Sequence, residues 1–121
     1  MNNHSGDALV VTCMDFRLQD FINDWISKNI PPRSHDRIAF AGGVKNLETI
    51  LGQVEISKRL HDIKKVILIN HEDCGAYGET GSQEKHAEDL KNAAAKIKEA
   101  HPDLEIKTYY LHLGGTFDEV S

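Results

Sequence analysis

The segment VILINHEDCGAYG (residues 66–78) combines the two features that decide the fold of this chain. Its first part is a continuous run of aliphatic residues, which is typical of a β-strand covered on both faces. Its second part is polar and contains glycine, and it places His71 three residues before Cys74. Because such strands occur mainly in parallel sheets, the segment predicts an α/β protein with polar chemistry just beyond a strand end.

Three other segments resemble strands in composition. ALVVTC (8–13) is short, apolar and rich in β-branched residues, and Asp15 and Arg17 follow it closely. Two further strands are predicted within RIAFAGG (37–43) and LEIKTYYLHL (104–113). The first two strands therefore each lead into a polar or glycine-containing segment, as the strand at residues 65–70 does.

Helical patterns separate these strands. Residues 18–30 carry apolar side chains at i, i+3, i+4 and i+7, and the proline pair at 31–32 ends the pattern. Asn46 and Ser82 are suitable N-caps for two further helices, the second of which runs to about Ala100. The alternation predicts a mostly parallel, four-stranded sheet with helices on both faces. Its simplest strand order, 2-1-3-4, brings the ends of the first and third strands together at a topological switch point.

Composition and charge exclude several classes of protein. The formal net charge is −5, from 14 basic and 19 acidic residues, and no basic run is long enough to indicate a nucleic-acid binder. No apolar run approaches the ~20 residues that span a bilayer, and the N-terminal residues lack the apolar region of a signal peptide. We therefore expect a single cytoplasmic domain, residues 1–121, with no nucleic-acid or membrane partner. In that reducing compartment two cysteines favour metal binding or catalysis over a disulfide.

The predicted strand order brings Cys13 close to His71 and Cys74. Thiolate and imidazole groups are ligands of tetrahedral zinc, whereas magnesium and calcium prefer oxygen. Three protein ligands indicate a catalytic zinc, because the fourth position is left for a water molecule whose pKa the metal lowers to about 7. We therefore predict one Zn²⁺ per chain, held by these three side chains.

Asp15 and Arg17 extend this hypothesis. On an extended segment, side chains two residues apart point to the same side, so the Asp15 carboxylate follows Cys13 toward the metal. The carboxylate could become a fourth ligand, or it could hydrogen-bond the water and orient it. A bidentate ion pair with Arg17 favours the second role, because it holds the carboxylate ionised and away from the metal.

Three of these segments resemble the signatures of the beta-class carbonic anhydrases: CMDFR (13–17), AGG (41–43) and INHEDCG (69–75). The resemblance extends over roughly residues 8–115, and it is greatest to the short, archaeal-like or plant-type branch of the family. It implies reversible hydration of carbon dioxide to bicarbonate and a proton. The site residues that it implies are Cys13, His71 and Cys74 as zinc ligands, Asp15 and Arg17 as the catalytic dyad, and Gly42 and Gly43 as positions of close backbone approach.

The chain departs from the family pattern in two places. Ala39 and Phe40 stand where the family usually has Arg-Asn before its Ala-Gly pair. The first strand begins near residue 8, so we also expect the N-terminal helical arm of the family to be absent. In the family that arm embraces a second subunit, and the site lies near the dimer interface. The resemblance therefore still implies a homodimer or a higher homo-oligomer.

Three alternative functions stay open at this point. The same fold could hydrolyse a substrate shaped like CO2, such as CS2 or COS. The chain could also be a non-catalytic, zinc-binding regulatory module. A redox dithiol formed by Cys13 and Cys74 is the third alternative, although the two residues do not form a C-x-x-C motif.

The remaining titratable residues near the motifs are assigned simpler roles. We expect the other histidines at the surface, and among them His86, which follows the predicted ligand loop, is a candidate proton shuttle. Glu72 and Asp73 are expected to be solvated loop charges that flank the zinc ligands.

Overall fold

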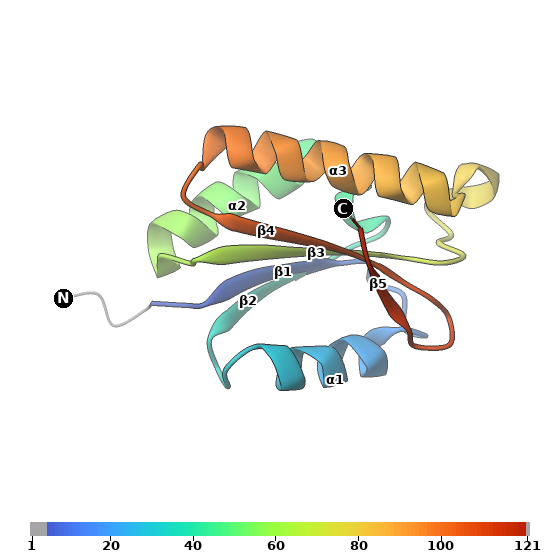
Figure 1. Ribbon diagram of the computed structural model, residues 1–121, viewed down its shortest axis with the longest axis horizontal. Coiled ribbons are helices and arrows are strands. Elements are labelled where there is room, and N and C mark those ends of the chain that lie inside the picture. The colour runs from blue at the N-terminus through green and yellow to red at the C-terminus, as the bar shows by residue number, and fades with distance from the viewer. Residues whose placement is uncertain (1–4, 121) are drawn as a thin grey trace.

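Three α-helices pack on the two faces of one five-stranded sheet in the computed structural model, which describes residues 5–120 (Figure 1). The strands are β1 (Ala8–Thr12), β2 (His35–Ala39), β3 (Lys65–His71), β4 (Glu105–Leu111) and β5 (Phe117–Glu119). The helices are α1 (Gln19–Asn29), α2 (Leu47–His61) and α3 (Gln83–Ala100), and the short 3-10 helices are η1 (Gly43–Lys45) and η2 (Gly78–Thr80).

The strand order is β2-β1-β3-β4-β5, and β2, β1, β3 and β4 run parallel. The predicted 2-1-3-4 order is therefore confirmed. Val11 of β1 pairs with Leu68 of β3, so Cys13 lies close to the end of β3, where His71 stands. The chain leaves β1 toward α1 on one face and leaves β3 toward α3 on the other, which makes this edge of the sheet a topological switch point (Figure 1).

The fifth strand corrects the prediction of a four-stranded sheet. β5 pairs antiparallel with β4, with Leu111 opposite Phe117 and Tyr109 opposite Glu119. The turn between them is closed by the His112 N–H donating to the Thr116 carbonyl at 2.9 Å, and Gly115 adopts a φ of +100° in it. A strand of three residues is too short to show a periodicity, so its pairing partner alone defines it.

The two faces of the sheet carry separate apolar cores. Val66 and Leu68 point toward α2 and α3, whereas Ile67 and Ile69 pack with the apolar stripe of α1. This alternation along β3 is the reason that the whole strand is apolar. The arrangement confirms the prediction of helices on both faces (Figure 1).

Local sequence signals explain the ends of the helices. The Asn46 side chain accepts a hydrogen bond from the Thr49 N–H at the start of α2, and Ser82 accepts one from the Lys85 N–H at the start of α3. β2 ends at Ala39, before the predicted glycine pair, because both Gly42 and Gly43 have a positive φ that a strand does not allow.

Two further predictions concern the ends of the chain and membranes. None of the helices within residues 5–120 is long and apolar enough to cross a membrane. The predicted absence of an N-terminal arm and the surface position of His4 involve residues 1–4, which lie outside the described residues. Both stay predictions.

Candidate metal centre

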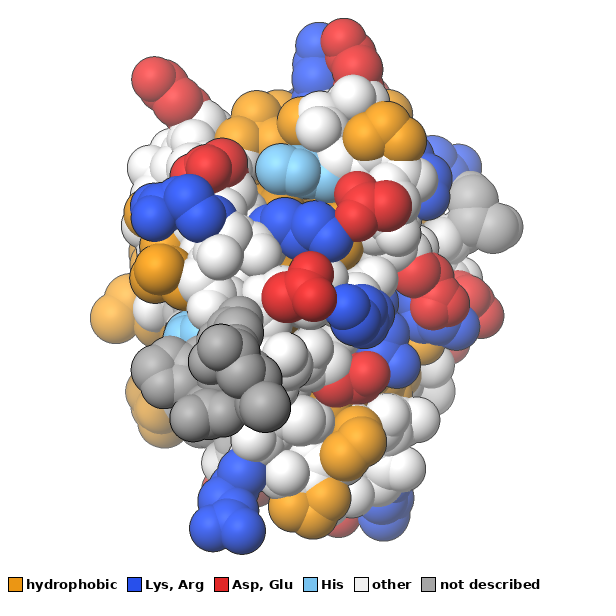
Figure 2. Space-filling view, turned by 90° about the vertical axis from the view of Figure 1, so that its left-hand side faces the viewer, with side chains coloured by type: hydrophobic (Ala, Val, Ile, Leu, Met, Phe, Trp, Pro, Cys, Tyr) orange, Lys and Arg blue, Asp and Glu red, His pale blue; other side chains and the backbone are white. Residues whose placement is uncertain are grey.

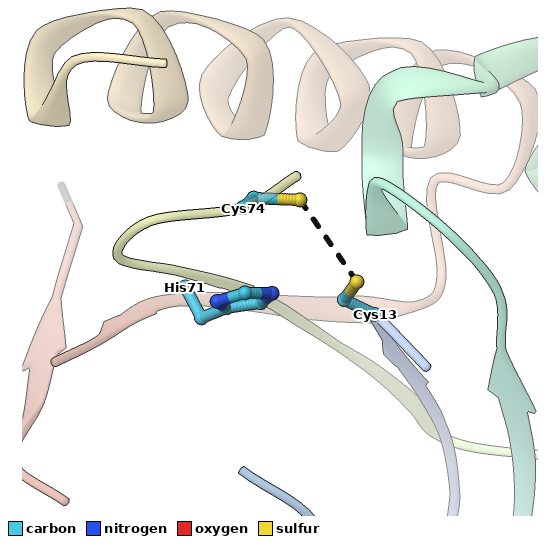
Figure 3. A group of neighbouring side chains, drawn as sticks. All are labelled: Cys13, His71 and Cys74. Atoms are coloured by element: carbon cyan, nitrogen blue, oxygen red, sulfur yellow. Dashed lines mark hydrogen bonds between the residues drawn. The ribbon is translucent and has the colours of Figure 1, made fainter. Parts of the chain in front are cut away.

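The structure brings Cys13, His71 and Cys74 together at the carboxyl end of the sheet (Figure 3). Cys13 directly follows β1, His71 is the last residue of β3, and Cys74 lies in the loop beyond β3. One ligand atom from each residue lies within 4.8 Å of the others, the two sulfur atoms are 3.9 Å apart, and all three residues are buried. Two thiols and an imidazole that converge in this way form a donor set suited to zinc.

The imidazole of His71 is oriented for binding a metal. Its Nδ1 donates a hydrogen bond to the backbone carbonyl of Glu72 at 2.7 Å. A proton therefore stays on Nδ1, and Nε2 is the nitrogen available to a metal ion. Burial lowers the pKa of His71, but hydrogen bonding to Cys13 and to the Glu72 carbonyl and the nearby Asp15 carboxylate raise it overall. Nε2 is buried and has no hydrogen-bond partner among residues 5–120. A buried nitrogen without a partner is costly, so this atom fits a site that a metal ion fills.

The two thiols differ in acidity. Burial raises the pKa of Cys13, but the adjacent His71 imidazole and the Gly42 N–H, which lies 3.4 Å from the sulfur, together lower that pKa to about 7. Burial raises the pKa of Cys74. Cys13 is therefore the more readily ionised of the two thiols, and ionisation is required of a thiol that binds a metal.

Gly42 and Gly43 bring the backbone close to this cluster. Their φ angles are +86° and +55°, which an L-residue with a side chain rarely adopts. A Cβ atom added at Gly43 would lie 2.6 Å from Asn70 Oδ1. The Gly42 N–H approaches Cys13 Sγ, Gly43 packs against Asn70, and a role of the two glycines in the site stays a prediction.

Asp15 and Arg17 form the expected ion pair beside the cluster. Arg17 Nη2 lies 2.6 Å from Asp15 Oδ2, and Nε lies 3.1 Å from both carboxylate oxygens. These hydrogen bonds from Arg17 lower the pKa of Asp15 to about 2. Asp15 Oδ2 is 3.9 Å from His71 Nε2, so an ionised carboxylate lies next to the ligand atoms.

An open cleft of about 580 Å³ leads to these residues. Residues 13–17 line it together with Ala41, Asp73, Gly75 and Ala76. Its rim carries two apolar side chains with large exposed fractions, Met14 at 61% and Phe16 at 87%. The cleft is therefore apolar at its mouth and charged where Asp15 and Arg17 meet.

The comparisons with known proteins agree with this geometry. A family described as "Putative carbonic anhydrase" matches residues 3–121. The chain belongs to this family. Two relatives, from Rickettsia bellii (strain RML369-C) and Rickettsia conorii (strain ATCC VR-613 / Malish 7), are each 27% identical over 136 residues, and both are named as uncharacterized proteins. The matches cover 97% of this chain and 83% and 73% of the two relatives.

Solved carbonic anhydrases have the same fold. The enzyme from Streptococcus mutans superposes with a TM-score of 0.72 at 18% identity, over 97% of this chain and 84% of that chain. The enzyme from Glaciozyma antarctica gives 0.73 at 21% identity, over 98% and 85%. One of two tetrameric beta-carbonic anhydrases from Sordaria macrospora gives 0.59 at 15% identity, over 98% and 82%. The predicted resemblance to the beta-class family is thereby confirmed.

The expectation for His86 was wrong, and those for Glu72 and Asp73 were incomplete. His86 is fully buried, and burial together with the nearby His71 lowers its pKa to about 4, so it is neither a surface histidine nor suited to carry protons at neutral pH. Glu72 is not simply a solvated charge, because its carboxylate accepts a hydrogen bond from the Leu113 N–H at 2.9 Å. Asp73 is exposed, but it binds Arg17 through both its carboxylate and its backbone carbonyl, at 3.1 and 2.9 Å.

The sequence reading also missed two residues that hold the site in place. Gln19 Nε2 donates to the carbonyl oxygens of Cys13 and Asp15, at 3.1 and 2.7 Å. Asn70 is buried beside His71 and binds three other segments. Its one sequence signal is an amide at the end of an otherwise apolar strand.

Proposed function

We propose that this protein catalyses the reversible hydration of carbon dioxide with one zinc ion held by Cys13, His71 and Cys74. The observation that supports this proposal most strongly is the unpartnered Nε2 of His71, which lies among two buried sulfur atoms and an ionised carboxylate. A structural zinc site has four protein ligands, whereas three side chains converge here, and Cys13 among them lines the cleft.

Zinc fits this donor set better than other common metal ions. Two thiols exclude a preference for magnesium or calcium, and a single histidine with two cysteines is a known ligand combination of catalytic zinc. When bound, zinc supplies Lewis acidity that lowers the pKa of a water molecule to about 7, the value for carbonic anhydrases with three-histidine sites. The free, buried cysteines support a reducing compartment such as the cytoplasm.

Asp15 is proposed as the group that orients the attacking water. Its carboxylate is ionised at neutral pH and lies on the cleft side of the ligand cluster, where it can accept a hydrogen bond from a water molecule. Arg17 occupies both carboxylate oxygens and is itself held by Asp73, so Asp15 is restrained from becoming a ligand. Accepting a hydrogen bond at Asp15 leaves one lone pair of the water directed at the substrate carbon.

Carbon dioxide needs an apolar space next to that water. Ala41, Gly75 and Ala76 contribute small, uncharged surfaces to the cleft beside Cys13. Gly42 is proposed to stabilise the Cys13 thiolate through its N–H, and Gly43 to allow the turn that brings Gly42 there. These apolar surfaces suit a small, linear, uncharged substrate and would hold it close to the reacting water.

The decisive experiment is stopped-flow CO2 hydration on protein with a measured zinc content. We expect the rate to scale with zinc occupancy from chelator-treated to fully loaded samples. Full CO2 hydration by zinc-free protein, or none by zinc-loaded protein at any pH between 6 and 9, would overturn the proposal. Hydrolysis of CS2 by the same loaded sample without CO2 turnover would assign the alternative activity instead.

We also propose that the chain works as a homodimer or higher homo-oligomer. Met14 and Phe16 expose large apolar surfaces beside the cleft, and within residues 5–120 no strand pairs with the outer edge of β2. The tetrameric enzymes from Sordaria macrospora support this proposal by sharing the fold. Sedimentation velocity tests it, and the double variant Met14→Ser/Phe16→Ser should shift the protein toward the monomer if these side chains lie in the interface.

A further inference from the structure

Asn70 immediately precedes the histidine of the candidate metal centre but points to the opposite face of the sheet. Successive strand residues alternate between faces, so Asn70 shares the face of Val66 and Leu68, beneath α2 and α3. It is 1% exposed. A buried amide in an apolar strand is costly unless all its polar atoms have partners, so its contacts require an explanation.

The Asn70 amide is bound on both of its polar atoms. Its Oδ1 accepts a hydrogen bond from the Val44 N–H at 3.3 Å, and its Nδ2 lies 3.1 Å from the Tyr77 hydroxyl and 2.9 Å from His86 Nδ1. One oxygen and two N–H groups thus meet one donor and two acceptors. The amide is held in a single orientation by η1, the loop before η2 and α3.

The partners beyond Asn70 support the same orientation. The Tyr77 hydroxyl donates to the Asp89 carboxylate at 2.8 Å, which leaves its oxygen free to accept from Asn70. Burial lowers the pKa of His86 to about 4, so its ring is neutral and Nδ1 can accept a hydrogen bond. The hydrogen bonds therefore run from β3 to α3 with their directions assigned, and the His86 proton lies on Nε2, which has no hydrogen-bond partner among residues 5–120.

This network reaches each of the three candidate ligands. Asn70 is bonded directly to His71 along the chain, and the Tyr77 N–H donates to the carbonyl oxygen of Cys74 at 3.1 Å. Val44 follows the glycine pair whose first N–H lies 3.4 Å from Cys13 Sγ. The Asn70 side chain packs closely against the glycine pair, since a Cβ atom added at Gly43 would lie 2.6 Å from Asn70 Oδ1.

We propose that Asn70 is a positioning residue that sets the spacing of Cys13, His71 and Cys74 by joining β3, η1 and the loop before η2 through one buried amide. The inference rests on the proposed function to the extent that these three side chains bind a metal. It goes beyond that function by assigning metal affinity and site geometry to a residue that contacts neither metal nor substrate.

Cobalt binding to the full chain tests this inference. Co²⁺ replaces Zn²⁺ in tetrahedral sites, and its visible and thiolate charge-transfer bands report ligand geometry independently of activity. Asn70→Leu keeps the side-chain size and removes all three hydrogen bonds. We expect it to weaken Co²⁺ and Zn²⁺ binding by about 10–100-fold, in a competition with a chelator, and to shift the cobalt bands.

A matched control separates positioning from general loss of stability. Val66→Ala lies on the same strand and the same face, four residues before Asn70, and its side chain is buried in the core under α2 and α3. It should lower the melting temperature while leaving the cobalt spectrum and the metal affinity as in the wild type. Equal spectra and affinities for Asn70→Leu and Val66→Ala would overturn the inference.

A milder variant keeps the test valid if Asn70→Leu does not fold. Tyr77→Phe removes only the hydroxyl that accepts from Asn70, and its ring remains in place. We expect a smaller shift of the cobalt bands in the same direction, and an unchanged spectrum would contradict the inference. Failure of the proposed function gives a different result, because wild-type protein would then bind Co²⁺ and Zn²⁺ without hydrating CO2.

Discussion

The two ends of the sheet both gather titratable side chains, but they use them differently. At the carboxyl end, the ligand atoms of Cys13, His71 and Cys74 converge, and His71 Nε2 has no hydrogen-bond partner among residues 5–120. At the amino end, one oxygen of Asp36 lies 2.5 Å from Ser57 Oγ and 2.6 Å from His61 Nδ1. The first group is buried, whereas the side chains of Asp36 and His61 are about one third exposed.

This difference shows what distinguishes a binding site from a structural contact. The Asp36 cluster contains an acid, a histidine and a hydroxyl, but the acid binds the other two, so the cluster holds β2 against α2. The face of the molecule at the amino end carries acidic and basic side chains interspersed with one another (Figure 2). Ligand atoms that converge around a buried nitrogen without a hydrogen-bond partner, and not residue type alone, support the carboxyl end as the candidate functional site.

Removing a ligand should have the largest effect at the carboxyl end. We expect Cys74→Ala to lose stoichiometric zinc and to reduce CO2 hydration to the rate of the uncatalysed reaction, because two remaining ligands do not hold the metal. Zinc analysis and stopped-flow hydration check this. Ser57→Ala at the amino end is the matched control, and it should keep both zinc and activity.

Removing the charge of Asp15 should have the next largest effect. Asp15→Asn keeps the size of the side chain but accepts a hydrogen bond from water more weakly, so we expect a loss of about 100-fold in kcat/KM with zinc content unchanged. Activity within twofold of the wild type would contradict the role of Asp15. Asp36→Asn makes the same chemical change at the other end of the sheet and should leave kcat/KM unaltered.

Releasing Asp15 from Arg17 should change the pH dependence of stability. The folded-state pKa of Asp15 is about 2, below the ordinary value of 3.8, so the ionised carboxylate stabilises the fold above pH 4. This contribution is lost as the pH falls from about 4 to about 2. We therefore expect the free energy of unfolding of metal-free Arg17→Gln to fall below that of the wild type at pH 7, and the difference to shrink at pH 2.5. A difference independent of pH in urea titrations would argue against the ion pair.

The smallest effect should come from the amino-end cluster. Asp36→Asn weakens the hydrogen bonds to Ser57 and His61, and we expect a loss of about 1 kcal/mol in the free energy of unfolding at pH 7. Urea titration measures this loss, and zinc content serves as the control. A loss of zinc in this variant would remove the distinction between the two ends of the sheet.

Much of the fold was predictable because its signals are local. The apolar runs of β1 and β3, the stripe of α1, and the caps Asn46 and Ser82 each depend on residues within one segment. The alternation of these segments restricts the sheet to few topologies. The observed order, in which β1 lies next to β3, places Cys13 beside His71.

Some details depended on partners that periodicity does not reveal. β5 forms because residues 117–119 pair with the edge of β4. Asp73 binds Arg17 although the two residues are 56 positions apart in the sequence. The sequence shows His86 at the start of a polar helix, where exposure is the ordinary expectation. Packing against Tyr77 and Asn70 buries it instead.

The sequence by itself therefore determined the order of the first four strands and the three helices, the identity of the candidate ligands and the family resemblance, because hydrophobic period and motif spacing are properties of the chain. Only the tertiary structure decided which polar groups pair and which stay free. It joined Asn70 to η1, the loop before η2 and α3, and it left His71 Nε2 without a hydrogen-bond partner within residues 5–120. The physical reason is that a hydrogen bond depends on the distance and direction between two atoms, which distant segments acquire only when they pack together.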